Sequence, residues 1–144
     1  MTVASILRHK GSEVVSVEPA LTALELARLL AARRIGAVLV RDRSGDIVGI
    51  VSERDIVGAL GRQGPAALDL TARQLMTADV RTATPRTTVE QAMEMMTSGR
   101  FRHLPVLEGG KLVGLVSIGD VVKARISQQE QEVDSLKAYV AGAA

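Results

Sequence analysis

The chain has 144 residues and no cysteine, so it is long enough for one compact domain or two very small ones and cannot contain a disulfide or a thiolate metal site. Hydrophobic residues make up 47% and aromatic residues 1%, so the core has to be built from aliphatic side chains and methionine. The formal net charge of +2 is spread along the chain, and no apolar stretch approaches the roughly 20 residues of a membrane span. We therefore expect a cytoplasmic protein that binds neither nucleic acid nor membrane.

The first half of the chain predicts a strand, a helix, two strands and a helix. Thr22 is a suitable N-cap for the first of these helices, and two apolar runs joined by a glycine-containing turn are typical of a hairpin. A helical leading segment is expected before them. The expected elements are a leading helix at 3–10, a strand at 14–17, a helix at 22–33, strands at 37–40 and 47–51, and a helix that begins at Ser52.

The second half predicts the same order, with Thr88 in the place of Thr22. Val133, Leu136 and Val140 form the apolar face of the last helix, which is enough to dock on a neighbour. The expected elements are a helical leading segment at 71–77, strands at 80–83, 103–107 and 112–116, a helix at 88–98, and a helix that begins at Ser117 and runs to about 140.

The two halves are an internal repeat. Pro19 and Pro85 match at an offset of 66 residues, whereas Gly49 and Gly114 match at an offset of 65, so one residue has been lost in a turn between them. A single unit is too small to bury much surface alone. We therefore predict an α/β (α+β) fold in which two quasi-equivalent β-α-β-β-α repeats pack through their small sheets with pseudo-two-fold symmetry. The predicted divisions are a first repeat at 1–60, a linker at 61–70, a second repeat at 71–126 and a C-terminal helical extension at 127–144.

A repeated heptapeptide carries the strongest functional signal. It reads Gly-Ile-Val-Ser-Glu-Arg-Asp at 49–55 and Gly-Leu-Val-Ser-Ile-Gly-Asp at 114–120. One interpretation is a capping box, in which serine and aspartate satisfy the amides at a helix start. The other is a ligand site, because a helix N-terminus suits a phosphate and an aspartate can accept hydrogen bonds from ribose hydroxyls. Gly49 and Gly114 favour the second interpretation, because glycine within a strand often marks the close approach of a ligand or of backbone.

The order of elements and the repeated heptapeptide resemble the tandem CBS domain pair, or Bateman module. Pro-x-x-Thr before the first helix and Leu104-Pro105-Val106 in a hairpin strand add to this resemblance, which covers residues 3–126. It implies up to two pseudo-symmetric sites in a cleft between the repeats, and an adenosyl ligand. We expect AMP first, with NAD(H), ATP and ADP as alternatives, and no catalytic cofactor or metal. The resemblance also implies a homodimer, which in this family is commonly a flat disc.

The resemblance implies two sets of ligand-binding residues. The first comprises Ser117, Gly119 and Asp120, with Lys10, Gly11, Ser12, Val14, Ile35, Gly36 and Ala37 as the opposite wall. The second comprises Ser52, Arg54 and Asp55, with Met76, Thr77, Ala78, Val80, Phe101, Arg102 and His103. Because Arg54, Arg102 and His103 bring cationic groups, we expect the second set to bind phosphate more strongly.

Several of these residues also have plain structural interpretations. His103 suits a surface strand and His9 a solvated helix, while Met93, Met95 and Met96 recur at helical spacing and fit a core better than a metal site.

The leading functional hypothesis is a regulatory module that senses an adenine nucleotide and acts through its dimer or on an effector protein. The alternative is a structural dimerisation module with no physiological ligand. An enzyme is not expected, because the sequence pairs no nucleophile with a base and has no phosphate-binding loop of the G-x-x-x-x-G-K-[ST] type.

Overall fold

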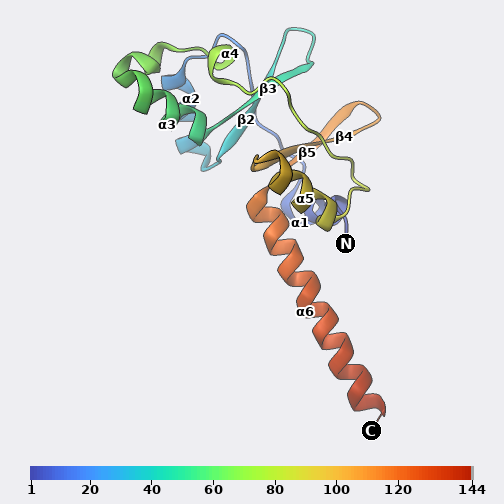
Figure 1. The fold of residues 1–144 in the computed structure, drawn as a ribbon. Coiled ribbons are helices and arrows are strands. Elements are labelled where there is room, and N and C mark those ends of the chain that lie inside the picture. The colour runs from blue at the N-terminus through green and yellow to red at the C-terminus, as the bar shows by residue number, and fades with distance from the viewer. Residues whose placement is uncertain (144) are drawn as a thin grey trace. The chain divides into compact units, whose positions relative to one another are not determined.

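The computed structural model describes residues 1–143 and confirms the predicted mixed α/β class (Figure 1). Its contacts divide the chain into two compact units. The central unit spans Val14–Val80, and the terminal unit combines Met1–Glu13 with the chain from Arg81 onward. Within the described residues, no helix has both the length and the apolar composition that crossing a membrane requires.

The central unit is built on a three-stranded sheet in the order β1-β2-β3. Strand β1 runs parallel to β2, and β2 and β3 form the predicted antiparallel hairpin. Thr22 caps α2 as predicted, and its hydroxyl accepts a hydrogen bond from the amide of Glu25 at 3.3 Å. The elements are β1 (Ser16–Val17), α2 (Ala23–Arg33), β2 (Ala37–Arg41), β3 (Ile47–Ser52), α3 (Glu53–Gln63), the 3₁₀ helix η1 (Gly64–Asp69) and α4 (Ala72–Leu75).

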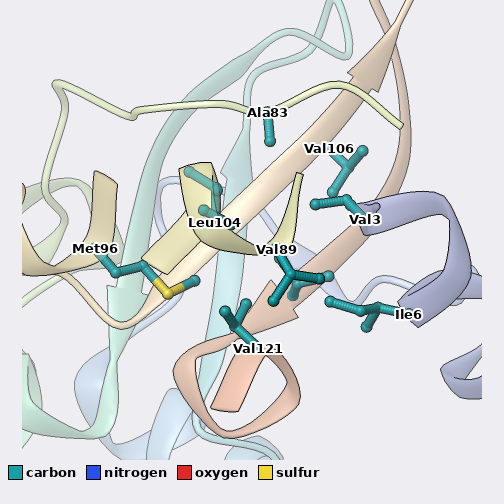
Figure 2. Packing of buried hydrophobic residues seen from close by; sticks show 10 residues of the cluster. Val3, Ile6, Ala83, Val89, Met96, Leu104, Val106 and Val121 are labelled. Carbon is teal, nitrogen blue, oxygen red and sulfur yellow. The ribbon is translucent and has the colours of Figure 1, made fainter. Parts of the chain in front are cut away.

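The terminal unit holds the antiparallel hairpin β4-β5, covered by helices. Figure 2 shows its core, in which Val3 and Ile6 of α1 lie near Val89 and Val106. Met96 is fully buried there, with Met93 and Met95 packed against the cluster, so the prediction of core methionines is confirmed. The elements are α1 (Val3–Lys10), α5 (Val89–Gly99), β4 (His103–Glu108), β5 (Lys111–Ser117) and α6 (Ile118–Ala143).

Each leading segment packs in the unit formed by the other sequence repeat. In the terminal unit, the amide of Val3 donates to the carbonyl of Thr87 at 2.8 Å. In the central unit, the amide of Ala72 donates to the carbonyl of Leu21 at 2.7 Å. The two bonds are equivalent in the repeat, so the compact units interleave along the chain. The sequence boundaries predicted at 60 and 70 describe the repeats and stay predictions, as does the packing of the repeats through their sheets.

The structure corrects two expected elements. The strand predicted at 80–83 is reduced to a single bridge between Ala83 and Val106, because the amide of Val80 turns back to the carbonyl of Ala78 at 3.0 Å. The helix predicted at 71–77 ends at Leu75, since Thr77 pairs with Ile50 of β3 instead. The segment 61–70 holds the end of α3 and all of η1, and its role as a linker between the repeats stays a prediction.

Candidate functional site

The two heptapeptides form the same corner, in which a strand ends and a helix begins. The backbone amide of Ser52 donates to Oδ2 of Asp55, and that of Ser117 donates to Oδ2 of Asp120, both at 2.8 Å. Both carboxylates are half-buried. The capping interpretation is therefore correct for both corners, and it engages one carboxylate oxygen of each aspartate.

A lysine completes the corner at Asp120. Nζ of Lys10, at the end of α1, donates to Oδ2 of Asp120 at 2.6 Å and to the carbonyl of Leu115 at 2.8 Å. The side chains of the pair are 38% and 25% exposed, so solvent screens the ion pair only in part. Partial burial raises the pKa of Asp120, but the hydrogen bonds from Lys10 and from the amide of Ser117 outweigh it, and the pKa lies below its ordinary value. The structure thus brings together three residues that the sequence assigned to one site.

The corner at Asp55 is built differently. Here backbone takes the place of the lysine, because the amide of Thr77 donates to the carbonyl of Ile50 at 2.9 Å and the amide of Ile50 donates back at 3.0 Å. Within the central unit, Asp55 forms no ion pair, and its described bonds come from Ser52 alone. Arg54 lies exposed on the first turn of α3. Asp55 is therefore the carboxylate without a cationic partner in its own unit.

The strand glycines make room for side chains of the leading segments. A Cβ at Gly49 would lie 2.7 Å from Cγ of Met76, and a Cβ at Gly114 would lie 2.9 Å from Cδ1 of Leu7. Neither distance leaves space for a methyl group. The close approach that the sequence assigned to a ligand or to backbone is thus made by packed side chains, and Met76 belongs to the edge of the central core. Aligning the leading segments on Thr2 and Thr71 would have shown that Leu7 and Met76 occupy equivalent positions.

The residues that open β2 and β4 lie beside the heptapeptide of their own unit. Ala37 pairs with Ser52 across the hairpin, and the carbonyl of Gly36 accepts from the amide of Glu53 at 2.9 Å. In the terminal unit His103 pairs with Ser117, and the carbonyl of Arg102 accepts from the amide of Ile118 at 2.7 Å. The sequence had assigned each of these segments to the opposite heptapeptide, and that assignment stays a prediction.

The other predicted residues lie in connecting segments or on the first turn of α6. Phe101 packs against the terminal core and lines an open hollow of about 540 Å³ beside α5. Among the described lining residues, it is the one that the sequence predicted for a site. Gly11, Ser12 and Val14 follow α1, Ile35 precedes β2, Ala78 and Val80 follow α4, and Gly119 lies on the first turn of α6. The described residues contain no cluster of three or more His, Asp or Glu side chains that could hold a metal ion.

The profile of the CBS domain matches residues 3–62 and again residues 72–127. The chain belongs to the CBS domain family. CBS-domain proteins are generally regulatory rather than catalytic. The structural match also bears out the fold, since a CBS-domain-containing protein from Agrobacterium tumefaciens superposes with a TM-score of 0.84 at 47% identity, covering 87% of this chain and 99% of that one.

Two further CBS proteins place the chain among its relatives. A mitochondrial CBS-domain-containing protein of Arabidopsis thaliana is 33% identical over 84% of this chain, which spans 61% of the length of that relative. A CBS domain protein from Pyrobaculum aerophilum, solved in complex with AMP, is 30% identical with a TM-score of 0.73, covering 83% of this chain and 89% of that one.

Proposed function

We propose that the chain is a regulatory module that binds an adenine nucleotide, with AMP as the first candidate and ADP, ATP or NAD(H) as alternatives. The observation that carries this proposal is the Ser-x-x-Asp corner, which occurs twice with the same hydrogen bond at 2.8 Å. Its occurrence in a family whose Pyrobaculum aerophilum member was solved with AMP supports the choice of ligand.

The chemistry of the corner suits a nucleoside phosphate. The capping bond is accepted by Oδ2, and a carboxylate has further acceptor capacity on its second oxygen for the hydroxyls of a ribose. The amides at the start of α3 and α6 favour the negative charge of a phosphate. We propose that the ligand binds at the two sets of residues predicted from the sequence, one around Asp120 and one around Asp55. Each set contains residues from both repeats.

The two corners are proposed to bind unequally. The carboxylate of Asp120 is already neutralised by the ammonium group of Lys10, 2.6 Å from Oδ2, so its second oxygen is a weaker acceptor for a ribose hydroxyl. Asp55 has no cationic partner in its own unit, and Arg54 beside it is exposed for a phosphate. We therefore expect the site at Asp55 to be the stronger one.

Regulation is proposed to act through a homodimer or through an effector protein. Binding would stabilise one arrangement of the chain, and the partner would respond to the change in population.

A structural dimerisation module without a ligand is the second candidate. The observation that favours it is that both serine–aspartate pairs are satisfied as capping boxes, so they need no ligand to account for them.

Thermal unfolding of the purified chain against AMP, ADP, ATP, NAD⁺, NADH and S-adenosylmethionine tests the proposal. A ligand that binds only the folded state adds about 2.7 kcal/mol of stability at a hundredfold excess over its Kd. The ligand-dependent shift is compared with that of Asp55→Ala and Asp120→Ala, each against its own unliganded melting temperature. Asp134→Ala on α6 is the matched control. If no ligand shifts nucleotide-free wild-type protein, the structural module is the better description.

A further inference from the structure

Among the described residues of the terminal unit, most of α6 has no packing partner. Val121, near its start, is fully buried in the terminal core, but every side chain from Gln129 to Gly142 is exposed. Figure 1 shows α6 running well beyond the hairpin and helices of its own unit. The exposed part of α6 is about as long as an isolated helix that is marginal in water, so a contact along it would stabilise it.

An apolar stripe follows this helix with a seven-residue period. Its members are Val122, Ile126, Val133, Leu136 and Val140, which are 40%, 51%, 51%, 63% and 60% exposed. In heptad notation, Ile126, Val133 and Val140 occupy successive a positions, while Val122 and Leu136 occupy d positions, with the polar Gln129 between them. The stripe is about 27 Å long at the rise of an α-helix. Branched residues at a with leucine at d favour two parallel strands.

The charges beside the stripe agree with a parallel pair. Glu132 is at a g position and Lys137 is at the following e position. In a parallel, in-register pair each g residue faces the e residue five positions later on the other helix, so Glu132 of each copy would meet Lys137 of the other. Arg125 and Glu130 have the same relationship with the signs reversed, although Arg125 also donates to Glu90 of its own chain at 3.0 Å.

We infer that α6 binds a second copy of this chain as a parallel, in-register two-stranded coiled coil. The six residues Val122, Ile126, Gln129, Val133, Leu136 and Val140 form its seam. The inference rests on α6 alone and does not depend on nucleotide binding. It places a dimer contact in the C-terminal helix, apart from any contact that the repeats make.

Disulfide trapping tests the register, because the chain has no native cysteine. In Leu136→Cys the two thiols would face each other across the seam, within the Cα separation that a disulfide spans. In Ala138→Cys, the matched control, the thiols lie at an f position on the opposite face. Mild oxidation of the full chain without nucleotide is expected to convert most of the first variant, and little of the second, to cross-linked dimer. Absence of a cross-link at 136, or equal cross-linking at both positions, overturns the inference.

Sedimentation equilibrium of the full chain gives an independent test that does not use oxidation. Leu136→Lys places a charge in the seam and is expected to raise the dimer dissociation constant by about tenfold or more, whereas Ala138→Lys leaves it unchanged. Glu132→Lys weakens the dimer, and adding Lys137→Glu restores it, because the pair is then reversed on both helices. The inference is overturned if Leu136→Lys leaves the dimer dissociation constant unchanged. It is also overturned if the wild-type chain stays monomeric.

Discussion

The corners at Asp55 and Asp120 share a sequence pattern and a capping bond, yet they differ in what lies beside the carboxylate. In the terminal unit α1 continues to Lys10, whose ammonium group holds both Asp120 and the carbonyl of Leu115. In the central unit α4 ends at Leu75, and backbone at Thr77 bonds to the equivalent carbonyl of Ile50. The position equivalent to Lys10 is Asp79, so the terminal unit presents a neutralised carboxylate and the central unit an unneutralised one.

The largest expected effect on this comparison is the loss of AMP binding in Asp55→Ala. Removing a charged acceptor from a ribose costs about 1.5–3 kcal/mol, or roughly tenfold to 150-fold in affinity. Titration calorimetry with AMP should show a smaller loss for Asp120→Ala, because Lys10 already neutralises that carboxylate. A larger loss for Asp120→Ala would show that the corner at Asp120, and not the one at Asp55, binds AMP more strongly.

The second effect concerns the glycines behind the two corners. Gly114→Ala and Gly49→Ala should each lower the free energy of unfolding by about 1–3 kcal/mol, because the new methyl group overlaps Leu7 or Met76. Urea denaturation measures this, and adding Leu7→Ala to Gly114→Ala should recover part of the loss. Gly119→Ala is the matched control, since its Cβ would meet nothing closer than Ser117 Oγ at 3.6 Å. Equal stability of all three variants would contradict the packing described for Gly49 and Gly114.

The third effect is the stability that Lys10 provides. Lys10→Met removes the ion pair and keeps much of the aliphatic stem, so we expect a loss of about 0.5–1 kcal/mol in the free energy of unfolding. Lys111→Met, in an exposed strand position, is the control and should leave stability nearly unchanged. If Lys10→Met also strengthens AMP binding at Asp120, Lys10 weakens that carboxylate as an acceptor for the ribose. Weaker binding would instead assign Lys10 to the phosphate.

The smallest effect is the pH dependence of that ion pair. A carboxylate whose pKa is lowered on folding contributes its full stability above its ordinary pKa of 3.8 and loses it as the pH falls through the lower folded value. The difference in unfolding free energy between wild type and Lys10→Met should thus be constant from neutral pH to about pH 5 and should shrink below about pH 4. A difference that grows on acidification would rule out Asp120 as its source.

Local patterns were sufficient to predict most of the fold. Thr22 and Thr88 cap their helices, the two hairpins form, and the methionines of α5 pack in the core, because caps, turns and helical periodicity act over a few residues. The serine–aspartate boxes are equally local, so the sequence identified them directly.

The remaining features depend on contacts between distant segments. The bond from Lys10 to Asp120 joins residues 110 positions apart, and no local signal specifies it. The early end of α4 follows from the pairing of Thr77 with Ile50, which overrides the helical tendency of the segment. Helical periodicity also does not specify the unit in which each leading helix packs, because each repeat has an equivalent strand glycine against which a side chain can pack.

The interleaved path of the chain affects how the molecule can be divided. Val3 and Ile6 belong to the core of the terminal unit, whereas Ala72 belongs to that of the central unit. A single peptide break within 61–70 would leave each fragment with a helix that completes the other fragment's core. Neither half would then be an autonomous folding unit, and mixing the two should restore the native structure by complementation, as in a split protein.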